Sequence, residues 1–288
     1  MFRGESSESF SLIPSVLRKN RKDEFYHLLS GAGTYVSESI RNENNFLSRA
    51  SEEFTLMQFF YRTANKTGHP LPPIQYEWHE RLVSNEVVFL DNLTKTWIPK
   101  EIEEIVALMQ HYGLPTRMLD WSENVLIALY FAAWGARERL RNQASSNDDH
   151  MVIWIFRKPY ECIGGYTPYE PFPVRFVTPS YANNPNLNAQ KGILTYCPLP
   201  LKYNQQDTDL PLDQIIEQYY HRPKTLLLHT VLTKVRIPIT DCFRTMVILN
   251  NFGINDSMVF PEYTSIANQL RQNAKLVDEV MHRNGAPE

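Results

Sequence analysis

Between residues 99 and 140 the sequence predicts a helix, a turn, a short extended segment and a second helix, and this run constrains the fold most strongly. In "PKEIEEIVALMQHYG" (99–113), Pro99 precedes three glutamates, and both residue types favour the first turn of a helix. The apolar positions form one stripe, made of Ile102, Ile105, Val106 and Met109. Gly113 is placed to end the helix, because glycine adopts the left-handed conformation of a helix end without strain. The sequence therefore predicts a capped helix with one buried face.

The segment after this helix is expected to be extended and to lead into a buried helix. "PTRMLDW" (115–121) indicates the extended part, and Ser122 is expected to cap the second helix. That helix, "ENVLIALYFAAWGARERL" (123–140), is apolar nearly all round in its first half, which predicts burial. It is too short and too soon followed by arginines to span a bilayer.

The remaining segments predict an α+β fold. "MFRGES" (1–6) indicates a short strand, residues 34–64 one or two amphipathic helices, and the Pro-rich segment 68–75 a connection. Further strands are expected at 151–156, 189–197 and 226–239, with a long structured loop over 157–189. Asp241 is placed to cap a helix that ends near Gly253, and a last helix is expected around 260–272. Because these strands are separated irregularly by helices and loops, a regular βαβ succession is disfavoured.

Composition excludes several classes of protein. The net charge of −3 disfavours a broad nucleic-acid footprint, although a narrow basic cleft stays open. The three cysteines (Cys162, Cys197 and Cys242) form no C-x-x-C pair, so a reducing cytoplasm is the expected location. No signal peptide, phosphate-binding loop, dinucleotide fingerprint, zinc-protease motif or nucleophile elbow is present, and no histidine pair has metal-ligand spacing.

Three polar stretches are candidates for chemistry. Arg3 beside Gly4 suits an anion clamp, because guanidinium offers a planar fork of donors and glycine lets a ligand approach the backbone. "QHYGLPTRMLDW" (110–121) allows two interpretations. In one, His111 interacts with the helix end, Arg117 pairs with Asp120, and Trp121 fills the core. In the other, the same stretch walls a polar cleft. In "NLNAQKG" (186–192), Gln190 could hydrogen-bond a sugar or base, or serve only the turn.

These stretches, in this order, resemble the FRG domain family. Phe2-Arg3-Gly4 matches the triplet that names the family, and "QHYGLPTRMLDWSENVLIALYFA" closely matches its most specific block, with Ser122 where threonine is commoner. "NAQKGILTY" (188–196) and "NNFGINDSMVFPE" (250–262) resemble later family elements. The resemblance implies a single domain over 1–288, with a helical insertion at about 34–98.

The order of these elements is similar to that of divergent ADP-ribosyltransferases. The resemblance implies a small split or mixed β-sheet core with NAD, as co-substrate, bound between two small sheets. It implies the catalytic residues Arg3, His111, Asp120 and Gln190, with Gln190 standing where related toxins carry glutamate. It further implies the cofactor-binding residues Arg3, Gly4, Tyr112, Gly113, Thr116 and Arg117, and no metal ligand.

The biological role that this resemblance implies is a toxin or anti-phage effector. Such an effector would modify a macromolecular acceptor (RNA, DNA or protein) and would be restrained by an antitoxin or regulatory protein, for which the helical region at 34–98 is a candidate docking surface. The alternative is a non-catalytic module that binds a nucleotide or nucleic acid. A hydrolase that uses His111 and Asp120 fits less well, because no nucleophile or metal accompanies them.

Overall fold

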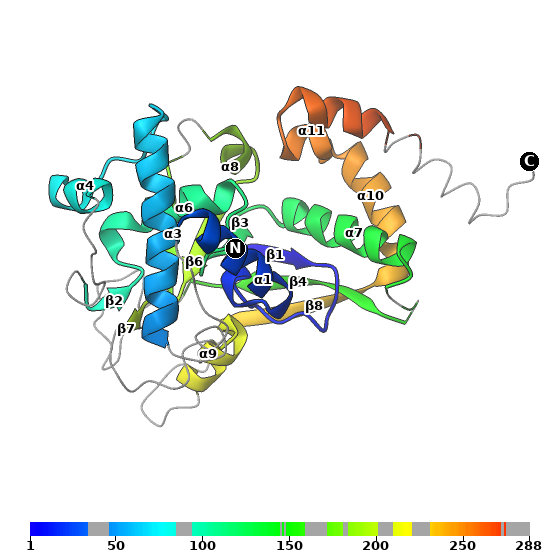
Figure 1. The fold of residues 1–288 in the computed structure, drawn as a ribbon. Coiled ribbons are helices and arrows are strands. Elements are labelled where there is room, and N and C mark those ends of the chain that lie inside the picture. The colour runs from blue at the N-terminus through cyan, green and yellow to red at the C-terminus, as the bar shows by residue number, and fades with distance from the viewer. Residues whose placement is uncertain are drawn as a thin grey trace, which may run out of the picture.

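The computed structural model is built around one antiparallel sheet. It describes residues 1–33, 46–84, 94–144, 146, 148–158, 172–180, 184–200, 210–220, 231–271 and 274. The six strands are β1 (Phe2–Glu5), β3 (Leu119–Ser122), β4 (His150–Phe156), β5 (Arg175–Val177), β6 (Gly192–Tyr196) and β8 (Leu232–Pro238). They lie in the order β5-β6-β3-β1-β4-β8, and every neighbouring pair is antiparallel (Figure 1). A second, two-stranded sheet pairs β2 (Thr96–Trp97) with β7 (Leu199–Pro200). The mixed α and β composition with antiparallel pairing agrees with the expected class.

The six-stranded sheet has a weak junction at its centre. Strand β1 pairs with β4 through four residue pairs, and β3 pairs with β6 through four. In contrast, β1 and β3 share only the pair Phe2–Ser122. The two small sheets expected from the sequence are thus one sheet, in which two groups of three strands separate beyond a single pair.

Two groups of helices flank this sheet. Helices α1 (Lys22–Gly31), α3 (Phe46–Lys66), α4 (Tyr76–Val83) and α6 (Glu103–His111) share a hydrophobic core with the β5–β6 side. Helices α7 (Val125–Arg141) and α10 (Cys242–Asn251) cover the β1–β4 side, and α9 (Leu212–Tyr220) contributes to a core on the opposite face (Figure 1). The short helices are α8 (Pro185–Ala189) and α11 (Asp256–Val259), and residues 263–271 are also helical. Within the described residues the 3-10 turns are η1 (Ser15–Leu17), η2 (Lys19–Arg21), η3 (Lys100–Ile102) and η5 (Ile239–Asp241).

Helix α7 lies directly against strand β1. Its buried face is rich in alanine, which lets the helix backbone approach the strand closely. A Cβ atom placed on Gly4 would lie 1.8 Å from the carbonyl oxygen of Ala128 and 2.8 Å from the amide nitrogen of Ala132. Glycine at position 4 is therefore required by the packing of α7 on β1.

Most of the expected elements are present where the described residues allow a comparison. Helix α6 ends at His111, and Gly113, two residues further on, has a φ of +82°, the left-handed conformation expected after the helix. The expected strands at 1–6, 151–156 and 189–197 are β1, β4 and β6, and β8 occupies the described part of 226–239. In the helical region at 34–98, the described part holds α3, α4 and strand β2. Residues 34–45 and 85–93 lie outside the described residues.

Two local expectations were wrong. Asn124, not Ser122, caps α7, because its side chain accepts a hydrogen bond from the amide of Leu126. The expected loop over 157–189 contains β5 and α8. Asp241 occupies the N-cap position of α10, as expected, although its side chain makes no capping hydrogen bond.

None of the helices in the described ranges has the length and apolar character needed to cross a membrane.

Candidate functional site

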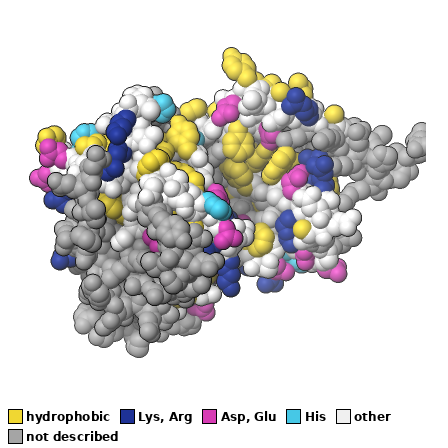
Figure 2. Space-filling view, viewed as in Figure 1, with side chains coloured by type: hydrophobic (Ala, Val, Ile, Leu, Met, Phe, Trp, Pro, Cys, Tyr) yellow, Lys and Arg dark blue, Asp and Glu magenta, His cyan; other side chains and the backbone are white. Residues whose placement is uncertain are grey.

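A cavity of about 1030 Å³ opens where strands β1 and β3 diverge. Its walls come from β1, α3, the Pro-rich segment 69–73, α6, β3, α7, the α8–β6 turn and Phe260. Figure 2 shows the surface hollowed between the two groups of helices, with hydrophobic side chains on both sides. The cavity therefore lies between the two halves of the molecule that the weak strand junction joins.

Six of the nine predicted site residues line this cavity and three do not. The six are Arg3, Gly4, His111, Tyr112, Asp120 and Gln190. They come from β1, the end of α6, β3 and the turn before β6. The other three (Gly113, Thr116 and Arg117) lie outside the lining.

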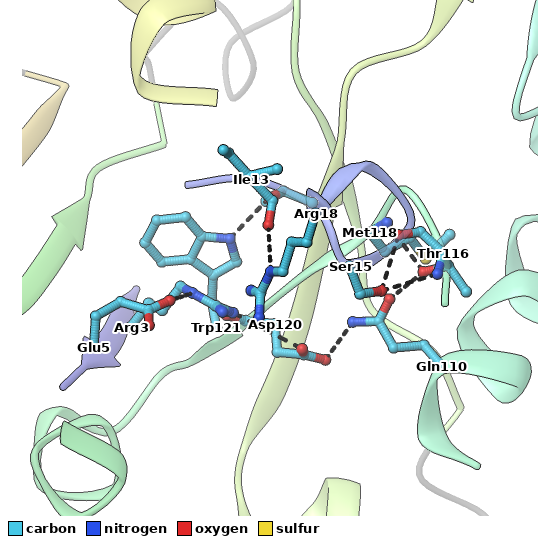
Figure 3. A network of polar contacts seen from close by, with 11 residues as sticks. Arg3, Glu5, Ile13, Ser15, Arg18, Gln110, Thr116, Met118, Asp120 and Trp121 are labelled. Carbon is cyan, nitrogen blue, oxygen red and sulfur yellow. Dashed lines mark hydrogen bonds and ion pairs between the residues drawn. The ribbon is translucent and has the colours of Figure 1, made fainter. Parts of the chain in front are cut away.

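Arg3 bridges the two diverging strands (Figure 3). Its Nε donates to Glu5 Oε1 on the same strand at 2.7 Å, and its Nη1 donates to the main-chain oxygen of Asp120 on β3 at 2.8 Å. Asp120 Oδ2 lies 3.8 Å from the same Nη1. Burial disfavours the charged guanidinium, but the carboxylates of Glu5 and Asp120 outweigh this effect and raise the pKa of Arg3 above its ordinary value. Arg3 therefore stays charged between two carboxylates.

A chain of polar contacts holds Asp120 from the side of α6. Gln110 Nε2 donates to Asp120 Oδ1 at 2.6 Å, and Thr116 Oγ1 donates to Gln110 Oε1 (Figure 3). The amide of Thr116 donates in turn to Ser15 Oγ at 3.0 Å. Thr116, which is 3% exposed, thus orients Gln110 from behind the cavity wall and lies too deep to contact a ligand there.

Arg117 belongs to a buried structural network. Its Nε donates to both carboxylate oxygens of Glu53, at 2.8 and 3.0 Å, and the side chains are 3% and 6% exposed. Trp97 Nε1 donates to Glu53 Oε2 at 2.7 Å. The interpretation that Arg117 pairs with Asp120 was wrong, since Asp120 meets Arg3 instead. In this position Arg117 links α3 to the segment before β3 and does not face the cavity.

The two glycines of the predicted cofactor set have structural explanations that involve no ligand. Gly4 lines the cavity, but its missing side chain makes room for α7 rather than for a ligand. Gly113 follows α6 in a left-handed conformation.

Gln190 is held by its own fold contacts. Its Nε2 donates to the main-chain oxygen of Val259 at 3.3 Å, and its main-chain oxygen accepts from Ser122 Oγ at 2.7 Å. These bonds tie the turn before β6 to α11 and to β3. The amide lines the cavity, and one of its two N–H donors is already engaged by Val259.

His111 and Tyr112 form the rim beside α6. Their rings meet edge to face with centroids 5.0 Å apart, and Tyr112 is 68% exposed. Burial lowers the pKa of His111 below its ordinary value, and the neighbouring charges of Glu262 and Asp120 only partly oppose this. The imidazole is therefore neutral at physiological pH and has a free lone pair.

Several lining or neighbouring residues were missed from the sequence. Glu5 follows Arg3 by two positions on β1, and strand alternation puts both on one face, which is a signal the sequence does carry. Arg18 interacts electrostatically with Arg3 and Asp120, and its Nε donates to the main-chain oxygen of Ile13 at 3.0 Å. Arg18 lies outside the cavity lining, and its place near Arg3 and Asp120 depends on the segment between β1 and α1, which no local pattern predicts.

The described residues hold no cluster of three or more histidine, cysteine or acidic side chains suited to a metal ion. Burial raises the pKa of the Cys197 thiol to about 12, so this thiol is protonated at neutral pH.

The sequence comparison agrees with the motifs. The family model of the FRG domain matches residues 1–141, which include β1, α6, β3 and α7. The stretches 188–196 and 250–262, which also resemble family elements, lie beyond this match. No curated protein and no solved structure matches the chain. The match identifies residues 1–141 as an FRG domain.

Proposed function

We propose that this chain transfers ADP-ribose from NAD to a macromolecule, with NAD bound in the cavity between β1 and β3. The observation that carries the proposal is the convergence of Arg3, His111, Tyr112 and Asp120 on one cavity. Ligand pockets commonly span roughly 300–1,000 Å³. The volume of about 1030 Å³ therefore has room for a dinucleotide and the reacting part of an acceptor.

Two arginines suit the pyrophosphate of NAD. Arg3 Nη2 makes no hydrogen bond within the described residues, since Arg3 donates there through Nε and Nη1. Nor does any described group accept from the terminal nitrogens of Arg18, whose Nε alone is engaged. These donors are available to phosphate oxygens or ribose hydroxyls, and guanidinium binds both well.

The rim beside α6 suits the nicotinamide ribose. The exposed ring of Tyr112 offers a stacking surface for nicotinamide, and neutral His111 can accept a hydrogen bond from a ribose hydroxyl. Bond cleavage leaves positive charge on the ribose, and the carboxylates around Arg3 offer oriented negative charge.

As part of this proposal, the enzyme is a cytoplasmic toxin or anti-phage effector that modifies RNA, DNA or protein. A separate antitoxin or regulatory protein would restrain it. The resemblance of the motif order to ADP-ribosyltransferases supports this role.

A non-catalytic module that binds a nucleotide or nucleic acid is the second candidate. One observation favours it: Gln190, at the position where related toxins carry glutamate, has its amide donor bound to Val259 and carries no charge.

Calorimetric titration with NAD, followed by an assay of nicotinamide release from labelled NAD, separates the candidates. The transferase requires both binding and release. Binding of NAD without release, in the presence of a cell extract as acceptor source, supports the module, and absence of both rejects the transferase.

A further inference from the structure

The proposed reaction needs a carboxylate held close to the ribose, and neither predicted position meets this need well. Gln190 is an amide, and its donor group is bound to the main chain. Asp120 is a carboxylate, but its side chain is 67% exposed, so water screens its charge strongly. Its Oδ1 is also engaged by Gln110 at 2.6 Å.

Glu5 has the properties that these two residues lack. It lies on β1 in the lining of the cavity, and its side chain is 14% exposed. Arg3 Nε fixes its Oε1 at 2.7 Å. Among the described residues, no group donates a hydrogen bond to its Oε2. One oxygen therefore orients the carboxylate, and the other is available to a ligand.

The position of Glu5 follows from the strand junction. Beyond the pair Phe2–Ser122 no residue of β3 pairs with β1, so on this side the end of β1 that carries Glu5 borders the cavity, while on its other side Glu5 pairs with Val152 of β4. Partial burial strengthens the electrostatic effect of a fixed charge, because water screens it less.

We infer that Glu5 is the catalytic carboxylate of this site, which faces the ribose and stabilises the positive charge that develops there; the inference rests on the proposed function. The bond between ribose C1′ and the nicotinamide nitrogen breaks, and nicotinamide leaves as a neutral molecule with the electron pair. The acceptor or a water molecule then forms the new bond to C1′, and its proton passes to neutral His111. Glu5 takes up no proton in this step, and Arg3 acts as its positioning residue.

The test compares two Glu→Gln variants of the full chain. Glu5→Gln keeps the shape of the side chain and removes its charge. Glu8→Gln is the matched control, since Glu8 pairs with Arg236 at 2.8 Å and lies outside the cavity lining. For each protein, calorimetry gives the Kd for NAD, and labelled NAD with water as acceptor gives the rate of nicotinamide release.

We expect Glu5→Gln to lower the release rate by roughly 10²–10³-fold, the usual loss when one oriented electrostatic group is removed. Its Kd for NAD should change by less than about threefold, as for an interaction made mainly in the transition state. Glu8→Gln should match the wild type in both measurements.

Release by Glu5→Gln at the wild-type rate overturns the inference and leaves the proposed function intact. Failure of the wild type to bind NAD or to release nicotinamide rejects the proposed function, and the inference falls with it. Should Glu5→Gln not fold, Glu5→Asp replaces it, because this variant keeps the charge but shortens the reach. Slower release with unchanged binding is then the expected result, and an unchanged rate refutes the role.

Discussion

Replacement of Arg117 by methionine should destabilise the fold without a direct effect on ligand binding. Arg117 donates through Nε to both oxygens of Glu53, and the two side chains are 3% and 6% exposed. Arg117→Met leaves the Glu53 carboxylate buried without this cation. Removal of one partner from a buried ion pair costs about 3–5 kcal/mol.

A second contact of Glu53 narrows the expected loss of stability. Trp97 Nε1 continues to donate to Glu53 at 2.7 Å, so the carboxylate keeps part of its stabilisation and the loss should lie near the lower end, about 3 kcal/mol. With an m value of about 2 kcal/mol per molar urea, the unfolding midpoint should fall by roughly 1.5 M. Urea unfolding followed by tryptophan fluorescence measures this shift.

Two companion variants control the experiment. Arg21→Met removes a comparable contact at the surface, where the partner Glu24 is 46% exposed, and should cost less than about 1 kcal/mol. A double variant, Glu53→Leu with Arg117→Met, should recover part of the lost stability, since apolar residues can replace a buried pair. If Arg117→Met unfolds within about 1 kcal/mol of the wild type yet loses affinity for NAD, Arg117 contacts the ligand and the structural assignment is wrong.

Three further changes test the site and its packing. Gly4→Ala places a methyl group 1.8 Å from the Ala128 oxygen, so it should lower the free energy of unfolding by about 3 kcal/mol or more. Thermal unfolding measures this loss, and an unchanged melting temperature contradicts the packing of α7 on β1. Because burial lowers the pKa of His111, the unfolded chain binds its proton more tightly, and stability should fall as the pH drops below 6.5 towards the lowered pKa. His111→Gln should remove this part of the pH dependence in unfolding curves, and an identical dependence in the variant refutes the assignment. Tyr112→Ala should change the free energy of unfolding by less than about 0.5 kcal/mol, because the ring is 68% exposed. In calorimetry the same variant should bind NAD roughly 2–10-fold more weakly, and an affinity equal to that of the wild type rules out stacking on this ring.

Local signals predicted the elements that depend on few neighbours. Helix α6 carries glutamates in its first turn, where the helix dipole favours negative charge, and is followed by a glycine in the left-handed conformation. Both features depend on one segment alone, and both are observed. Strand β5 has only three residues, too few for an alternating pattern to separate it from the surrounding loop.

The hydrogen-bond partners and packing that the sequence did not predict depend on contacts between segments far apart in the chain. Ser122 was expected to cap α7, but β3 includes this residue, and its hydroxyl donates to the main-chain oxygen of Gln190. The partner of Arg117 is Glu53, which lies 64 positions away on α3, so no local spacing could identify it. The requirement for glycine at position 4 likewise depends on the packing of α7 against β1, which no local pattern in the sequence predicts.

The candidate site was predicted in outline from the order of its motifs. Arg3, His111, Asp120 and Gln190 do line one cavity. The contacts of these residues did not follow from the motifs. Gln190 donates to the main-chain oxygen of Val259, and Glu5 accepts from Arg3. Only the position of Glu5 has a sequence signal, since alternation on β1 puts it on the same face as Arg3.

A crystal structure with a non-cleavable NAD analogue tests the central claim most directly. We expect the dinucleotide between β1 and β3, with its pyrophosphate within hydrogen-bond distance of Arg3 and its nicotinamide ribose beside Glu5. Density for the analogue elsewhere on the molecule, with the cavity between these strands free of it, would contradict the account.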